Sequence, residues 1–217
     1  MDSVQASNER SPAGEYRAPL DGAPRGRLVF SDGTPDLTVS ADRSLGDLAH
    51  VRFDGIPPRV RVAGGEVVVS YPGRGLFGWL RYALRPARAQ VGLNPSVSWA
   101  FDFREGVQRL WADLRELALA DVEVHGGVGR AELWLPRPTG TVRLSVVGGV
   151  GNLTMHRPAG TPLRLSVDRG LSSLSIDGQE LGGVGGGLRR ETAGWPTAPD
   201  RLDVAVAGGV GHLAIVD

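Results

Sequence analysis

From residue 97 onward, apolar and polar side chains alternate in short runs that end at glycine-containing turns. Counting back from each recurring glycine, the third, fifth and seventh residues are apolar, whereas the fourth and sixth are polar or small. These apolar sets are Trp99/Phe101/Phe103, Ala120/Val122/Val124, Val142/Leu144/Val146, Leu163/Leu165/Val167 and Leu202/Val204/Val206. Alternation with a period of two is typical of a β-strand with one buried face. Each turn is therefore predicted to follow a half-buried strand.

A second apolar alternation follows each turn, at the fourth and sixth residues after the glycine. These pairs are Leu110/Ala112, Ala131/Leu133, Leu153/Met155, Leu174/Ile176 and Leu213/Ile215. The glycines at 106, 127, 149 and 170 recur about every 21 or 22 residues, and a fixed period of this size indicates stacked repeats. We expect an all-β fold, a β-solenoid resembling a parallel β-helix with about seven rungs and a short helical insertion. An antiparallel sandwich stays open, because alternation does not reveal strand direction.

The domain organisation follows from where this pattern begins and where it is interrupted. Residues 1–26 lack apolar periodicity and are predicted to be a disordered leader. Residues 27–217 are predicted to form a single β-solenoid domain, with weaker copies of the pattern before residue 72. Insertions are expected at 72–96 and at 178–198.

The two insertions differ in composition. Within the first, residues 77–85 are predicted to form a short helix that ends before Pro86. The second contains five glycines among residues 182–187 and is interpreted as a flexible loop.

Composition and charge exclude several classes of function. The 217 residues carry no net charge, which argues against a general attraction to nucleic acid. With no cysteine, the chain has neither disulfides nor thiolate metal sites. The sequence contains neither a secretory signal pattern nor an apolar run of about 18 residues. We therefore expect a cytoplasmic protein, and contact with the membrane surface is the alternative location.

Several short motifs are similar to those of a known group of domains. They lie at 97–101, 133–136, 147–153 and 157–160. In these segments the chain resembles the bacterial β-solenoid domains described as putative adhesins and the C-terminal domain of LiaF-type proteins of cell-envelope stress signalling. The resemblance covers residues 97–217 well and 28–70 weakly. It implies a fold and a family of unknown function, and it implies no catalytic residue.

The first insertion is the main candidate for recognition. It combines the aromatic residues Phe77, Trp79 and Tyr82 with the basic residues Arg81 and Arg85. A basic segment with aromatic side chains suits an acidic protein partner or an anionic membrane surface. The alternative is that it packs along the flank of the repeat or covers one of its ends.

A second candidate follows from aligning successive repeats, which places Trp134, His156 and Asp177 at equivalent outward positions. Stacked strands would bring such residues about 4.8 Å apart. An aromatic ring beside a His/Asp pair suits a sugar or a metal ion, although two potential ligands are too few for a metal site. We therefore predict Trp134 and His156 as interaction residues, and no metal or cofactor. The alternative is an ordinary solvated ladder.

Charged residues also align across the repeats. Asp121 and Arg143 are expected to form an ion pair across neighbouring strands, in a column that continues through Arg164 and Asp203. The carboxylates of Asp102, Glu123 and Glu132 are interpreted as scattered over different repeats. The sequence therefore does not predict the paired carboxylates of a carbohydrate-active enzyme.

The function that these observations favour is a non-catalytic scaffold or protein-interaction module. A peripheral membrane regulator of cell-envelope stress is the alternative, and a carbohydrate-binding or carbohydrate-active protein ranks third. The partner is expected to be a protein and not nucleic acid, because the chain carries no net charge. Nucleotide binding is not expected either, because residues 182–187 lack the Gly-Lys-Ser/Thr ending of a phosphate loop. Because Leu213/Ile215 is the last strand pair, we expect an uncovered end there. This end is expected either to self-associate, end to end or through its edge, or to be capped by the N-terminal leader.

Overall fold

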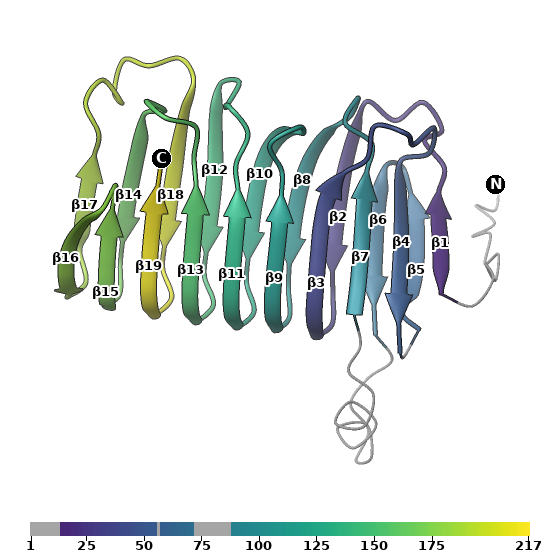
Figure 1. Cartoon of the computed structure of the whole chain (residues 1–217), viewed down its shortest axis with the longest axis horizontal. Helices are drawn as coiled ribbons and strands as arrows, with labels where there is room; N and C mark the ends of the chain where they lie inside the picture. Colours follow the sequence, from purple (N-terminus) through teal and green to yellow (C-terminus); the bar gives the residue numbers. More distant parts are fainter. Residues whose placement is uncertain (1–13, 56, 72–87) are drawn as a thin grey trace, which may run out of the picture.

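A computed structural model describes residues 14–55, 57–71 and 88–217. Every regular element in these ranges is a β-strand, and the strands form two mixed sheets (Figure 1). The all-β prediction is therefore confirmed. Within the described ranges, no helix has the length and apolar character needed to cross a membrane. The helix predicted over 77–85 lies outside the described residues.

The ten-stranded sheet is called sheet A and the nine-stranded sheet is called sheet B. In spatial order, sheet A contains β1 (Glu15–Ala18), β4 (Ala49–Asp54), β7 (Arg88–Leu93), β3 (Thr34–Ala41), β9 (Val107–Asp113), β11 (Val128–Trp134), β13 (Val150–His156), β19 (Val210–Val216), β15 (Leu171–Ile176) and β16 (Gln179–Val184). Sheet B contains β17 (Leu188–Glu191), β14 (Leu163–Val167), β18 (Arg201–Val206), β12 (Thr141–Val146), β10 (Ala118–Val124), β8 (Ser98–Phe103), β2 (Arg25–Phe30), β6 (Glu66–Ser70) and β5 (Arg59–Ala63).

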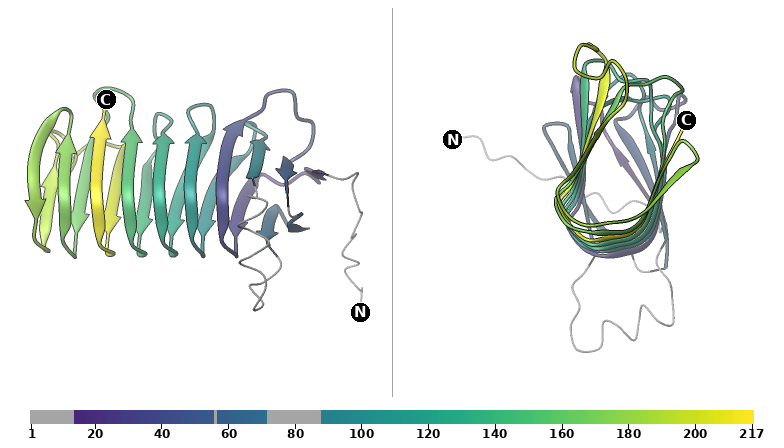
Figure 2. Two further views of the ribbon diagram at one scale, coloured as in Figure 1. Left: turned by 60° about the horizontal axis from the view of Figure 1, so that its bottom comes forward. Right: turned by 90° about the vertical axis from the view of Figure 1, so that its left-hand side faces the viewer.

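The repeating unit is a strand of sheet B followed, through a short turn, by a strand of sheet A, and we call this pair an arch. The arches β8–β9, β10–β11 and β12–β13 stack with all of their strands parallel to those of the neighbouring arch. Viewed along the stack, the two sheets face each other and meet at the turns (Figure 2). The alternating pattern could not distinguish parallel from antiparallel strands, and the structure shows that the strands of neighbouring arches are parallel.

Side chains that point between the two sheets form the core. Trp99, Phe101 and Phe103 are at most 2% exposed, and the ring of Phe103 stacks on that of Phe30 with centroids 5.9 Å apart. One predicted position is wrong: a bulge shifts the register between Leu119 and Asp121, so that Leu119 is buried and the intervening alanine is exposed. The other predicted inward residues are buried, except Ile176, which is partly buried against the core.

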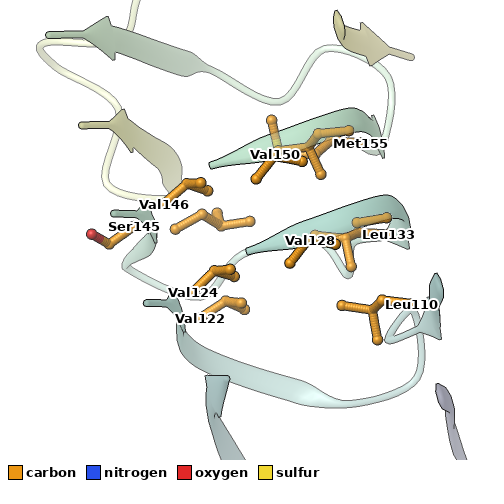
Figure 3. Close-up of a pocket in the computed structure, with 12 residues that line it drawn as sticks. Leu110, Val122, Val124, Val128, Leu133, Ser145, Val146, Val150 and Met155 are labelled. Carbon is orange, nitrogen blue, oxygen red and sulfur yellow. The ribbon is translucent and has the colours of Figure 1, made fainter. Parts of the chain in front are cut away.

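The space between the sheets is filled and offers no ligand pocket in its middle part. An apolar cavity of about 20 Å³ remains there, lined by residues such as Leu110, Val124 and Met155 (Figure 3). This is close to the volume of one water-sized probe, and an apolar wall gives a water molecule no partners. The hydroxyl of Ser145 points away from these side chains.

The order of the arches in space differs from their order in the sequence. The final arch, β18–β19, lies between β12–β13 and β14–β15, because β18 pairs with both β12 and β14 and β19 pairs with both β13 and β15. The predicted uncovered end at Leu213/Ile215 is therefore wrong. Both of these side chains are at most 1% exposed, inside the stack.

Charged side chains match this order on the outside of sheet B. Asp203 lies between Arg143 and Arg164 as the register partner of both. The Arg164 guanidinium donates two hydrogen bonds to the Asp203 carboxylate. Asp121 lies opposite Arg143, but the described residues do not form the ion pair expected between them, and the inserted strand separates two arginines that would otherwise be neighbours.

Arg157, which directly follows β13, forms contacts that depend on the same spatial order of the arches. Its side chain is only 4% exposed and forms ion pairs with Asp177 at 2.6 Å and with Asp217 at 2.7 Å. Its other terminal nitrogen donates to the carbonyl oxygen of Thr161. Since these partners follow β15 and β19, one buried guanidinium joins three neighbouring strands of sheet A.

The stack ends in strands that run in the opposite direction. At one end β4 and β5 pair antiparallel with β7 and β6, and β1 then pairs antiparallel with β4. At the other end β16 and β17 pair antiparallel with β15 and β14. The parallel arches are therefore covered at both ends by reversed strands, a way of protecting sheet edges.

Three predicted segments differ from the observed elements. Residues 178–198, expected to be a flexible loop, contain β16, β17 and the buried Trp195, whose ring lies under the guanidinium of Arg164 at 4.0 Å. Residues 15–18 of the expected leader form β1, and β2 begins at Arg25. Residues 88–93 of the expected first insertion form β7 in sheet A.

Glycine is required beside the turns because neighbouring arches approach closely there. A Cβ on Gly148 would overlap the carbonyl oxygen of Gly126, and a Cβ on Gly208 would overlap that of Gly148. None of these three glycines has a positive φ, so close approach and not backbone conformation excludes a side chain. The recurring Gly149 is different, because its Cβ would come no closer than 3.8 Å to the carbonyl oxygen of Gly209.

We expect Gly148→Ala to lower the free energy of unfolding by about 2–3 kcal/mol, because the added methyl group must push two backbones apart. Gly149→Ala, one residue away, is the matched control and should change it by less than about 1 kcal/mol. Urea unfolding followed by circular dichroism measures both. Equal effects of the two substitutions would contradict the close-approach explanation.

Candidate interaction surface on sheet A

The outer face of sheet A carries a row of aromatic side chains from three successive strands. Trp111 belongs to β9, Trp134 to β11 and His156 to β13, and each lies outside because its neighbours in the strand point inward. The rings of Trp134 and His156 stack with centroids 4.7 Å apart and planes 8° apart. Trp111 contacts Trp134 at 4.9 Å with its ring tilted by 50°. We call these three residues the aromatic row.

The aromatic row is both held in place and accessible to solvent. The Nε2 atom of His156 forms a hydrogen bond of 3.1 Å with the Glu132 carboxylate, which fixes the imidazole beside Trp134. Trp111 is 40% exposed, one of two large hydrophobic residues that are exposed in the described ranges. A large ring held at the surface by a rigid sheet loses little conformational entropy when a partner covers it.

A depression of about 350 Å³ adjoins the row on the side of β3 and β7. Trp111 lines it together with Asp36, Arg88, Arg109 and Arg130. The Arg109 guanidinium binds the Asp36 carboxylate through two hydrogen bonds of 2.6 and 2.8 Å, and Arg88 lies 3.5 Å from the same carboxylate. Within the described residues Arg130 has no ion pair, so its charge remains available to an acidic group of a partner.

The sequence-based sites are only partly brought together. Trp134 and His156 are register partners and stack, as expected. Asp177 does not join them, because β19 intervenes and Asp177 binds Arg157 instead. Phe77, Trp79, Arg81, Tyr82 and Arg85 lie outside the described residues, so their role stays a prediction.

Sequence reasoning did not single out Trp111. The repeat contained the signal, because Trp111 is the fifth residue after Gly106 and Glu132 is the fifth after Gly127. These two residues are register partners in the structure. Extending the alignment to this position would have placed Trp111 beside Glu132 and diagonally next to Trp134.

A second cluster lies on the outside of sheet B. Asp102 and Glu123 are register partners on β8 and β10, which corrects the interpretation that these carboxylates are scattered. Together with His125 they form the one group of three potential metal-ligating side chains in the described part of the chain. Asp102 is only 2% exposed, because the side chains of Arg27 and Arg104 cover it.

The ionisation of the neighbouring carboxylates reflects their different partners. Burial raises the pKa of Asp102, but hydrogen bonds from Arg104 and Arg27 outweigh it and leave this pKa below its usual value. Burial also raises the pKa of Asp121, where the charge of Glu123 acts in the same direction. The first carboxylate therefore favours the folded state when ionised, whereas the second opposes it.

Comparison with solved structures finds a protein of similar fold. The solved structure of a putative cell adhesion protein from Clostridium sporogenes ATCC 15579 is 19% identical and superposes with a TM-score of 0.72, over 93% of this chain and 96% of that chain. A putative adhesin from Bacteroides fragilis NCTC 9343 is 9% identical, with a TM-score of 0.28 over 93% of this chain and 95% of that chain.

Residues 65–156 match the family model described as the N-terminal domain of toast_rack, DUF2154. No curated protein matches the chain. The family match and the shared fold confirm the predicted resemblance to adhesin-like domains of unknown function.

We expect Asp102→Asn to lower the free energy of unfolding at pH 7 by about 1–3 kcal/mol, because the charge-assisted hydrogen bonds of two arginines are weakened. The pKa of Asp102 is lower in the folded state than in the unfolded state. Its ionised carboxylate therefore stabilises the folded protein above the unfolded-state pKa of about 3.9, and this stabilisation is lost as the pH falls through the folded-state pKa. The variant should therefore lose less stability than the wild type on acidification to pH 3.

Asp121→Asn is the control with the opposite sign. Because its folded-state pKa is raised, the ionised side chain costs stability above the unfolded pKa, and removing the charge should leave stability at pH 7 unchanged or higher. Urea unfolding at both pH values tests the pair. A loss at pH 7 in Asp121→Asn equal to that in Asp102→Asn would contradict these assignments.

Proposed function

We propose that the chain is a non-catalytic β-solenoid scaffold that binds a protein partner through the outer face of sheet A. The observation that carries the proposal is the exposed Trp111 beside the stacked Trp134 and His156. Tryptophan and arginine are the residues most enriched where protein interfaces gain their energy, and the adjoining depression supplies arginines.

The geometry favours a protein over a saccharide. The ring of Trp111 is tilted by 50° from that of Trp134, so the two indoles do not form one flat platform on which a sugar ring could lie. The depression contains Arg88, Arg109 and Arg130 with the carboxylates of Asp36 and Glu132, and charges of both signs complement a mixed protein surface.

The known structures support an interaction role. The Clostridium sporogenes structure is described as a putative cell adhesion protein, and adhesion is binding without chemical conversion. The cytoplasmic location, the contact with an anionic membrane through residues 72–96 and self-association through the ends of the stack stay predictions.

The test places a photo-crosslinking amino acid at position 38, which lines the depression, and identifies the captured protein by mass spectrometry. Affinity for the purified partner is then measured for wild type, Trp111→Ala and Trp134→Ala. Each substitution should weaken binding by about 10- to 30-fold, as expected for an aromatic residue at the centre of an interface.

Val147→Ala is the matched control, because Val147 is 49% exposed and follows β12 of sheet B. It should leave the affinity unchanged. Binding that survives both tryptophan substitutions, or that Val147→Ala weakens to the same extent, would exclude the outer face of sheet A as the recognition surface.

A further inference from the structure

One buried carboxylate oxygen on sheet B has no hydrogen-bond partner. The Oδ2 atom of Asp102 accepts hydrogen bonds of 2.9 Å from both Arg27 and Arg104. Its Oδ1 atom is equally inaccessible to solvent and accepts none. Buried polar atoms in folded proteins are nearly always paired, and an exception calls for a missing partner such as a water molecule or an ion.

Two further ligand atoms lie next to this oxygen. The Nε2 atom of His125 is 3.9 Å from Asp102 Oδ1 and 3.5 Å from Glu123 Oε2. All three ligand atoms lie within 4.8 Å of one another. The separations between the imidazole and the two carboxylates are longer than ordinary hydrogen bonds, so these groups do not satisfy one another directly.

The backbone fixes this arrangement. Asp102 and Glu123 occupy matching positions on adjacent parallel strands, so their side chains leave the same face of sheet B. His125 follows β10 and donates its backbone N–H to the carbonyl oxygen of Phe103 at 2.8 Å. The loop residue is thereby tied to the strand that carries Asp102.

We propose that Asp102, Glu123 and His125 bind one divalent transition-metal ion, with Zn²⁺ as the best-suited example. Ligand atoms about 2.0–2.1 Å from a tetrahedral zinc lie about 3.3 Å from one another, so small side-chain rotations would bring the three atoms into position. A set of one imidazole and two carboxylates suits zinc and its neighbours better than Mg²⁺ or Ca²⁺, which prefer oxygen ligands alone.

The two arginines have a defined place in this site. By binding Oδ2 of Asp102, Arg27 and Arg104 hold the carboxylate so that Oδ1 faces His125, the role that outer hydrogen bonds have at metal centres. Their positive charges also oppose a cation, which limits the affinity. Arg27 also lies 3.6 Å from Glu123 Oε2 and 3.9 Å from Glu66, so its charge is shared among three carboxylates, and an ion would compete with it for Glu123.

Three ligands from the described residues leave a fourth tetrahedral position to solvent or to a group from another molecule. The side chains of His125 and Glu123 are 47% and 42% exposed, so an ion would enter from their side, and they must move aside because Oδ1 of Asp102 is inaccessible to solvent. The site lies on sheet B and does not depend on the proposed partner surface of sheet A.

Isothermal titration of the full chain, without a histidine tag, with ZnCl₂ in a non-chelating buffer tests the proposal. We expect one ion per chain in the wild type, and binding at least about tenfold weaker in His125→Ala and in Glu123→Gln. Both replaced side chains are nearly half exposed, so the variants should keep the fold, which circular dichroism verifies. Co²⁺ should give the absorption bands of a tetrahedral ion in the wild type and not in His125→Ala.

His212→Ala and His156→Ala are the controls, because both residues lie on sheet A, where His212 is exposed and His156 contacts Glu132 and Trp134. Unchanged titration curves for both support the assignment. No zinc binding by the wild type tighter than about 1 mM, or binding that survives His125→Ala, would overturn it. Loss of the ion in His156→Ala would likewise overturn it and place the ion at the aromatic row.

Discussion

The close parallel contact between neighbouring arches is the constraint on which the rest of this structure depends. The arches can approach only where no Cβ intervenes, and Gly126, Gly148 and Gly208 provide that space at successive levels. With the backbones in contact at the turns, the strands pair in register along both sheets, and every inward position meets its equivalent in the next arch. The continuous core follows from this alignment, because a single arch cannot bury its own apolar side. The same alignment generates the outer rows of side chains on which both proposed sites lie.

Charged groups then select one order among arches that are otherwise nearly interchangeable. The apolar pattern of β14–β15 would fit against β12–β13 as well as against β18–β19, because all of these strands alternate in the same way. A direct contact between β12 and β14 would place Arg143 beside Arg164, and like charges opposite each other destabilise a sheet. Asp203 on the intervening strand removes this repulsion. Arg157 acts at the opposite edge, where its buried guanidinium pairs with the carboxylates that follow both β19 and β15 and so joins these strands to β13.

Much of the strand content and of the core could be predicted from the sequence, because alternation reports directly which side chains are buried. Leu119 escaped this reasoning because a bulge changes the count by one residue and leaves no signature in composition. The order of the arches escaped it as well, since a repeat specifies what a unit looks like and not which unit lies beside it. Among the site residues, aligning the repeats predicted that Trp134 pairs with His156. The same alignment also places Asp102 opposite Glu123. The burial of Asp102 could not be predicted in this way, because it depends on Arg27 from a strand 75 residues away in the sequence.

The insertion of β18–β19 into the middle of the stack has a consequence for how the protein is made. During synthesis, β14 and β15 leave the ribosome before the arch that must separate them from β12 and β13 exists. During that interval β14–β15 lacks its final neighbour, and a premature contact with β12–β13 would have to break before β18–β19 could enter. The C-terminal part of the stack can therefore close only after β18–β19 has been made, whereas β8–β13 can assemble in the order in which they are made.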